Sequence, residues 1–129
     1  SYCRLLQKGK QDFPVRSDDR KKLILNAKNY MEEHYKDALS LESISNVVGI
    51  SASYFSHLFK SETGKNYVDF LNEIRMKHVL DELENTNDKI LAIAERNGFR
   101  NLEYFSRFFK KKMGTSPAAW RKNRWEKEK

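Results

Sequence analysis

A stretch of 11 residues occurs twice in the chain, and this duplication limits the possible folds more than any other feature. Residues 54–64 read YFSHLFKSETG, and residues 104–114 read YFSRFFKKKMG. The similarity extends upstream, where residues 44–49 parallel residues 93–98. The offset there is 49, because the second copy carries one additional residue before its YFS motif. Two copies are too few for a solenoid, so the pattern predicts a small unit that has been duplicated.

The first copy has the features of a capped helix with one apolar face. Ser51 is placed to cap the N-terminus, and Phe55, Leu58 and Phe59 follow at helical spacing. Gly64 lies where a residue of left-handed conformation ends a helix. A helix over this stretch would therefore bury its phenylalanines and expose its polar residues.

The second copy repeats this layout. Asn101 is placed as the cap, three phenylalanines lie at the matching positions, and Gly114 closes the copy. In both copies a short apolar-periodic segment and a glycine precede the capped helix. Helix, tight turn and second helix with a polar outer face is the arrangement of a helix-turn-helix. The sequence therefore predicts an all-α chain with two helix-turn-helix units.

The segments around the repeats complete a prediction of about seven helices. Two further helices are predicted before the first copy, from Asp18 or Asp19 to about Tyr35 and from Leu41 to Val48 after the cap Ser40. Between the copies, one helix is predicted from Tyr67 to about Glu84 after the cap Asn66, and another over much of the segment Asp88 to Asn97. A last helix is predicted from Pro117 onward after the cap Ser116. The long helix carries apolar residues on two faces, as expected of a helix that contacts both units.

These elements predict an order of domains. We expect a linker over residues 1–18, a first unit over 19–66, a connecting helix over 67–85, a second unit over 86–124 and a frayed tail over 125–129 that includes Trp125. Residues 1–18 lack a convincing period and contain Pro14. They are expected to lead from an upstream sensing or receiver domain.

Composition limits the function classes. The single cysteine, Cys3, cannot form an internal disulfide. No run of 18 apolar residues predicts a membrane span. Three scattered histidines give no metal spacing, and no paired carboxylates, activated nucleophile or glycine-rich phosphate loop stand out. We therefore expect neither an enzyme nor a cofactor or metal site.

The net charge of +7 is unevenly distributed. Residues 1–18 contribute +2, residues 19–85 contribute −2, and residues 86–129 contribute +7. The positive potential thus belongs to the second copy and the tail, as expected for a polyanion partner. A basic surface that serves only solubility explains the charge equally well, and the repeat favours the polyanion.

In its repeat and the residues around it, the chain resembles the DNA-binding domain of the AraC/XylS family of bacterial transcription regulators. The resemblance covers about residues 23–124. Its motif residues are Ile93, Ala94, Gly98, Phe99, Tyr104, Phe105, Ser106, Arg107, Phe109, Lys110, Lys111, Gly114, Ser116, Pro117, Trp120 and Arg121. The chain departs from the family after Arg75, where Val79, Glu82 and Leu83 replace the usual alanine and leucine pair, and a slightly different packing is expected. The YFSHLFK sequence of the first unit is similar to that of family members fused to response-regulator receivers.

The resemblance implies that the second helix of each unit enters the major groove. Carried over by position, the base-facing candidates are Ser53, Ser56 and His57 in the first unit and Glu103, Ser106 and Arg107 in the second. The phosphate candidates are Tyr54, Lys60, Arg100, Asn101, Tyr104, Lys110 and Lys111. For each lysine a merely solvated position remains the alternative. For Tyr54 and Tyr104 the alternative is packing at the edge of the unit.

The resulting hypothesis is a sequence-specific, double-stranded DNA-binding domain that activates transcription in the cytoplasm, with RNA polymerase as a further partner. We expect one molecule to place its two recognition helices in successive major grooves. The alternative is a basic helical module that binds an acidic protein or an anionic membrane. That alternative predicts one continuous basic amphipathic helix, whereas the charge here spreads over several short segments.

Overall fold

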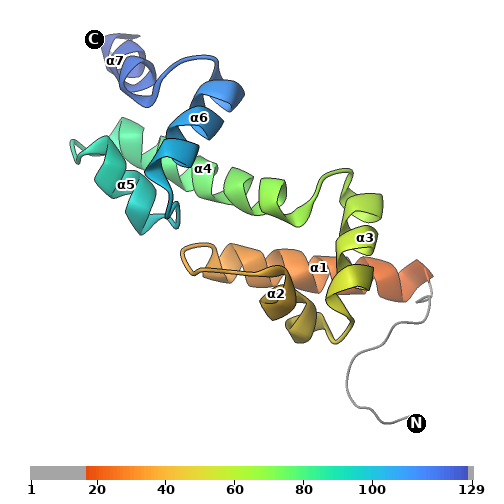
Figure 1. Cartoon of the computed structure of the whole chain (residues 1–129). Helices are drawn as coiled ribbons and strands as arrows, with labels where there is room; N and C mark the ends of the chain where they lie inside the picture. The colour runs from red at the N-terminus through yellow and green to blue at the C-terminus, as the bar shows by residue number, and fades with distance from the viewer. Residues whose placement is uncertain (1–16, 128–129) are drawn as a thin grey trace. The chain divides into compact units, whose positions relative to one another are not determined.

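The computed structural model describes residues 17–127, which form seven helices and no strand (Figure 1). This confirms the all-α prediction and the number of helices. The helices are α1 (Ser17–His34), α2 (Leu41–Val48), α3 (Ala52–Thr63), α4 (Tyr67–Asn85), α5 (Ile90–Arg96), α6 (Leu102–Met113) and α7 (Pro117–Lys127). Cys3, Pro14 and nearly all of the predicted linker lie outside the described residues.

The chain divides into two compact units within α4, where the first ends at Leu71 and the second begins at Asn72. In the first unit α1, α2 and α3 pack against one another. The rings of Phe55 and Phe59 lie 5.5 Å apart, and Phe59 meets Phe70 of α4 edge to face at 5.3 Å. The inner face of α3 is thus buried as the sequence predicts.

The second unit is built around the phenylalanines of α6. Its core contains Met76, Val79, Leu83, Ile93, Ala94, Phe99, Phe105, Phe108 and Phe109. Trp120 of α7 lies edge to face against Phe109, with 6.2 Å between the ring centroids. The same α6 residues that the repeat placed on one face therefore form the centre of this core.

The two repeated helices share their boundaries. Each has 12 residues, begins after a side-chain cap and ends at a glycine of positive φ. The Oγ of Ser51 accepts from the backbone N–H of Tyr54 at 3.2 Å, and the Oδ1 of Asn101 accepts from the N–H of Tyr104 at 2.9 Å. These contacts confirm both predicted N-caps.

The predicted caps of the other helices are also present. Ser40 and Ser43 exchange side-chain and backbone hydrogen bonds at the start of α2, which is a capping box. The Oγ of Ser116 accepts from the N–H of Ala119 at 3.2 Å, and Pro117 is the first residue of α7. Proline suits this position because the N–H that it lacks has no partner within a helix.

Gly64 and Gly114 end α3 and α6 in the left-handed region, with φ of +82° and +78°. At either glycine an added Cβ would meet no atom within 4 Å. Only the torsion therefore resists a side chain there.

We expect Gly114→Val to lower the free energy of unfolding by about 1 kcal/mol or more, because a β-branched L-residue strongly disfavours positive φ. Urea denaturation followed by circular dichroism measures the change. Gly114→Asn is the matched control and should cost less, since asparagine tolerates this conformation. Equal unfolding midpoints for Gly114→Val and the wild type would contradict the torsional argument.

Two helix boundaries differ slightly from the sequence prediction. Helix α1 begins at Ser17, one or two residues early. Helix α5 begins at Ile90, because Asp88 is held in the preceding turn. There its backbone N–H donates to the Oγ1 of Thr86 at 3.3 Å, and its carboxylate accepts from Arg96 at 2.7 Å. Lys89 caps α5 without a side-chain hydrogen bond.

The predicted fraying at Trp125 is wrong. Helix α7 continues to Lys127, and the Nε1–H of Trp125 donates to the backbone carbonyl of Glu84 at 3.1 Å. The guanidinium of Arg121 lies over the Trp125 ring, 4.9 Å from its centroid. The indole is thereby fixed between its own helix and the end of α4. Residues 128–129 of the predicted tail lie outside the described part of the chain.

Arg121 closes the end of α4. Its Nε donates to the carbonyl of Leu83 at 3.0 Å, its Nη1 to that of Asp88 at 2.7 Å and its Nη2 to that of Thr86 at 2.6 Å. The last carbonyls of a helix lack partners within the helix and carry partial negative charge. One guanidinium therefore satisfies the helix end and the turn that leads to α5.

Candidate DNA-binding surface

The outer face of α3 carries the candidates of the first unit. Ser53, His57 and Lys60 are exposed, while Ser56 and Tyr54 are half-buried. Ser53, Ser56, His57 and Lys60 lie on the helix face opposite the buried Phe55, Leu58 and Phe59, and Tyr54 lies at the edge between the two faces. A polar helix face with an apolar back is what major-groove entry requires.

The outer face of α6 carries those of the second unit. Its exposed side chains are Glu103, Ser106, Arg107, Lys110 and Lys111. The spacing of three and four residues gathers most of them on one helix face. Neither Lys110 nor Lys111 forms an ion pair within residues 17–127, whereas Lys112 pairs with Glu73 at 3.2 Å.

Two further candidates lie in the turn before α6. Arg100 and Asn101 are both exposed. Because the Oδ1 of Asn101 caps the helix, only its amide nitrogen is available for a phosphate. Arg100 and Asn101 therefore lie beside the start of α6, whereas Lys110 and Lys111 lie in its last turn.

Tyr104 is half-buried in the first turn of α6. Its ring stacks on Phe108 at 5.9 Å, so the packing role is realised. Its hydroxyl oxygen accepts from the Nδ2 of Asn72 at 3.0 Å, and the Nη1 of Arg75 donates to the Oδ1 of Asn72 at 3.1 Å. The phosphate role of Tyr104 stays a prediction.

The sequence did not indicate Asn72 or Arg75, because the contact of Asn72 with Tyr104 crosses 32 positions of the chain and follows no period, and Arg75 joins it only through Asn72. Burial lowers the pKa of the Arg75 guanidinium from its ordinary value, and the nearby positive charge of Arg100 lowers it further. Arginine nevertheless stays protonated at neutral pH. Two positive charges, those of Arg75 and Arg100, therefore lie near the α6 N-terminus, where Glu103 carries a negative one.

Glu82 holds the first helix of this unit in place. Its carboxylate accepts from the Nε of Arg96 and from the Nδ2 of Asn97, each at 2.6 Å. Hydrogen bonds to Asp88 and then to Glu82 raise the pKa of Arg96. Glu82, where a slightly different packing is expected, thus makes a polar contact between α4 and the end of α5. Asn97 is fully buried, and its Oδ1 has no hydrogen-bond partner.

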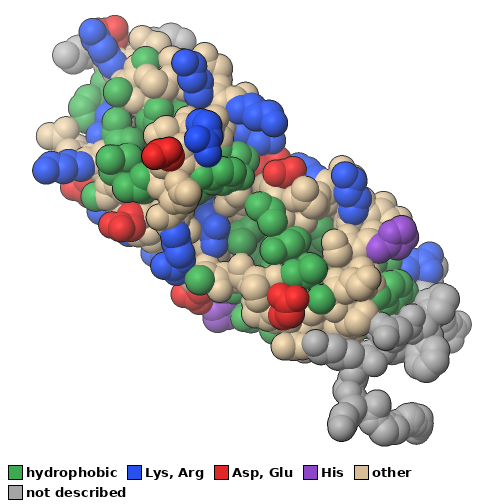
Figure 2. Space-filling view, viewed as in Figure 1, with side chains coloured by type: hydrophobic (Ala, Val, Ile, Leu, Met, Phe, Trp, Pro, Cys, Tyr) green, Lys and Arg blue, Asp and Glu red, His purple; other side chains and the backbone are tan. Residues whose placement is uncertain are grey.

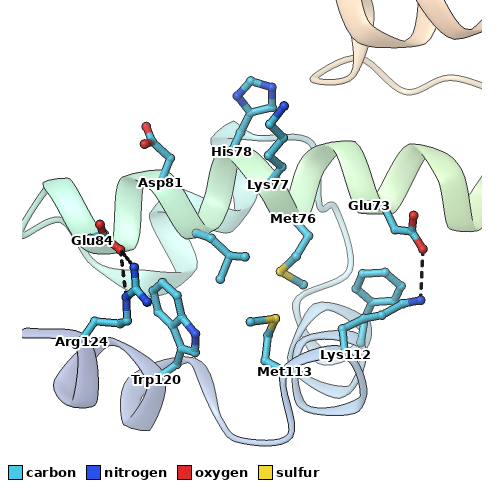
Figure 3. A pocket seen from close by; sticks show the side chains of 12 residues that line it. Glu73, Met76, Lys77, His78, Asp81, Glu84, Lys112, Met113, Trp120 and Arg124 are labelled. Atoms are coloured by element: carbon cyan, nitrogen blue, oxygen red, sulfur yellow. Dashed lines mark hydrogen bonds and ion pairs between the residues drawn. The ribbon is translucent and has the colours of Figure 1, made fainter. Parts of the chain in front are cut away.

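A groove of about 840 Å³ lies on the second unit between α4, α6 and α7 (Figure 3). Met76, Met113 and Trp120 are part of its apolar lining. At its edges Glu73 pairs with Lys112 and Glu84 with Arg124, as the dashed lines show. Both carboxylates are thus engaged with cations.

Two features are absent from residues 17–127. No helix there is both long enough and apolar enough to cross a bilayer. Within the same range no group of three or more histidine, cysteine or acidic side chains converges as metal ligands would.

Comparisons with known proteins agree with this geometry. A family model described as a helix-turn-helix domain matches residues 44–123. The chain is 32% identical over 123 residues to YijO, an uncharacterized HTH-type transcriptional regulator of Escherichia coli (strain K12). The aligned segment covers 95% of this chain and 42% of that protein. The chain therefore spans about two fifths of the length of YijO and 13% of the length of the similar HTH-type regulators of Staphylococcus aureus.

Two solved structures are similar in fold. One is the C-terminal domain of AraT, a response regulator from Geobacillus stearothermophilus, with 36% identity, a TM-score of 0.74 and coverage of 79% of this chain and 85% of that one. The other is the DNA-binding domain of AdpA, a global transcriptional factor, in complex with a target DNA, with 25% identity, a TM-score of 0.72 and coverage of 78% and 90%. Together with the two capped helix-turn-helix units, these matches show that the chain belongs to the AraC-type family of helix-turn-helix transcription regulators.

Proposed function

We propose that the chain binds double-stranded DNA sequence-specifically and regulates transcription, with α3 and α6 as the helices that enter the major groove. The observation that carries the proposal is the matched construction of these helices. Both have 12 residues, a capped start, a buried aromatic face and an outer polar face. The AdpA domain of similar fold was solved with a target DNA, which supports the same partner here.

The exposed face of α6 suits base recognition. Arg107 can donate two hydrogen bonds to the O6 and N7 of guanine, Glu103 can accept from the N4 of cytosine, and Ser106 suits either kind of edge. On α3, Ser53, Ser56 and His57 offer shorter polar groups for the same purpose. Since the two helices differ at these positions, we propose that they read different base sequences.

The cationic groups around these helices suit the phosphate backbone. Lys110 and Lys111 lie in the last turn of α6, and Arg100 and Asn101 lie just before its start. Lys60 has the corresponding place on α3. Contacts of this kind set position along the duplex without reading its sequence.

The chain is further proposed to act as the DNA-binding end of a longer regulator. The greater length of the matched relatives supports an additional sensing or receiver domain. Within that protein we propose activation of transcription through RNA polymerase in the cytoplasm. We also propose that both helices read one duplex in successive major grooves.

The alternative partner, an anionic membrane or acidic protein, requires a continuous basic strip. On the face shown in Figure 2, Lys and Arg side chains are instead interspersed with carboxylates and apolar side chains. This distribution favours DNA, where individual cations meet individual phosphates.

Selection from a randomised duplex pool, followed by gel-shift titration, tests the function. We expect enrichment of one site and binding to it at least 1000-fold tighter, on the order of specific over non-specific affinity, than to random duplex. Anionic vesicles serve as the competing partner. Retention on vesicles without enrichment of any duplex would contradict the proposal.

The affinity for duplex should fall steeply with salt. With about five to eight phosphate contacts, the slope of log affinity against log salt should be roughly −4 to −7, because each neutralised phosphate releases condensed counterions. Fluorescence anisotropy between about 50 and 200 mM salt measures it. A flat response would exclude a phosphate-dominated interface.

A further inference from the structure

The carboxamide of Asn72 joins two side chains of different helices near the start of α6. It is almost fully buried, with 3% of its surface exposed. On one side it lies 3.1 Å from the Nη1 of Arg75, and on the other 3.0 Å from the hydroxyl oxygen of Tyr104. All three residues belong to the second unit.

The direction of these hydrogen bonds follows from the chemistry of arginine. A guanidinium only donates, so the Oδ1 of Asn72 must face Arg75. The Nδ2 must then face Tyr104, and it also only donates. The Tyr104 hydroxyl is therefore an acceptor in this contact, and its proton is directed elsewhere. Asn72 thus prepares Tyr104 to donate a hydrogen bond to a further acceptor.

The surroundings indicate that this acceptor is an anion. Arg75 is half-buried, and the charge of Arg100 is near enough to lower its pKa in addition to the effect of burial. Arg100 itself is exposed, but its charge repels that of the partly desolvated Arg75, and a bound anion relieves that repulsion. Arg100 directly precedes the N-cap residue Asn101, and Tyr104 lies in the first turn of α6. Both donors therefore lie where the proposed recognition helix begins.

We propose that Arg75, Arg100 and Tyr104 bind one phosphodiester of the DNA backbone, with Asn72 as the positioning residue that orients the Tyr104 hydroxyl. This rests on the proposed function and adds a phosphate anchor from α4 to the α6 surface. A phosphodiester offers two charged oxygens, which suit a guanidinium fork and a hydroxyl donor together.

The first unit lacks the same anchor. Its buried α1 residues Ile24, Ala27 and Met31 have the same spacing as Met76, Val79 and Leu83 of α4, with an offset of 52. By this correspondence Arg20 stands at the position of Asn72, and Leu23 at that of Arg75. Arg20 is paired with Glu62 at 3.6 Å, and Leu23 carries no charge. The phosphate anchor therefore belongs to the second unit alone.

Two substitutions separate the parts of the site. Tyr104→Phe keeps the ring on Phe108 and removes only the hydroxyl, and Arg75→Met removes the charge. Each should weaken binding to selected and random duplexes alike by about 5- to 30-fold. Arg75→Met should also reduce the salt slope by about one, whereas Tyr104→Phe should leave it unchanged. Lys122→Met, which removes an exposed charge on α7, is the charge-matched control and should change affinity less than twofold.

Duplexes that carry a single neutral methylphosphonate identify the contact directly. A methylphosphonate at one backbone position should lower the affinity of the wild type about tenfold. The same methylphosphonate should not lower the affinities of Arg75→Met and Tyr104→Phe any further. A merely structural role of Arg75 or Tyr104 would not remove the effect of one phosphate. Thermal melting reports whether each variant is folded, and Tyr104→Phe decides the outcome if Arg75→Met is not.

Three results would overturn the anchor or its restriction to the second unit. The first is that every methylphosphonate costs both variants as much as the wild type, while the wild type still selects a duplex; the proposed function then stands without this site. The second is that Tyr54→Phe in the first unit shows the same loss with the same single-phosphate signature. The third is that inorganic phosphate raises the melting temperature of the wild type but not of Arg75→Met, while no single methylphosphonate in the duplex lowers the affinity of the wild type. The site would then be one for free phosphate. Failure of the wild type to bind any duplex would overturn the function and the anchor together.

Discussion

Replacement of Arg121 by alanine is expected to lower the free energy of unfolding of the second unit by about 2–4 kcal/mol. The substitution leaves the carbonyls of Leu83, Thr86 and Asp88 without the donor that they share. It also removes the cation that lies over the Trp125 ring. Urea denaturation measures the loss, and near-ultraviolet circular dichroism of the tryptophans should report the loosening of α7.

Arg121→Lys should recover little of that stability, because a single ammonium group cannot reach three carbonyls in a fixed fork. Lys122→Ala is the matched control on the same helix. It also removes one positive charge, but its side chain is exposed, so a change of less than about 0.5 kcal/mol is expected. A loss for Lys122→Ala equal to that for Arg121→Ala would show that charge alone, and not the carbonyl contacts, stabilises this end of α4.

Arg107→Ala is expected to have the largest effect on sequence recognition. It should weaken binding to the selected duplex by about 1–3 kcal/mol, which is roughly 5- to 150-fold, and relax the preference at one base pair. Arg107 is exposed on α6, opposite the buried Phe105, Phe108 and Phe109, so the fold should be unaffected. Titration of the selected duplex and of its single-base variants measures both quantities.

Lys111→Ala is the comparison for Arg107→Ala within the same helix. Its loss should be similar on selected and random duplexes, because a phosphate contact carries no base information. An equal loss on both kinds of duplex for Arg107→Ala would reassign Arg107 to the backbone. Measuring both variants at one salt concentration keeps the electrostatic contribution comparable.

The local chemistry of the chain was predictable from its sequence. Caps at Ser51 and Asn101 and closing glycines at Gly64 and Gly114 follow from preferences that act within a few residues. The buried face of α6 follows from helical period alone. Neighbouring residues determine these features, so no knowledge of the tertiary structure was needed.

Contacts between distant segments were not predictable in the same way. Asn72 meets Tyr104 across 32 positions and Arg121 meets Leu83 across 38. The partner of a polar side chain depends on which helices pack together, and sequence period gives no information on that. Trp125 was misjudged for this reason, since its partner, the carbonyl of Glu84, lies 41 positions away.

The open space beside Gly64 and Gly114 has a stereochemical consequence. Since an added Cβ would meet nothing within 4 Å, these positions exclude a side chain by its chirality and not by its size. A D-amino acid has the mirror-image torsional preference, so D-alanine would adopt this φ without torsional strain and would also narrow the unfolded ensemble. Among genetically encoded residues the achiral one fits best. The ends of both proposed recognition helices are therefore specified by handedness.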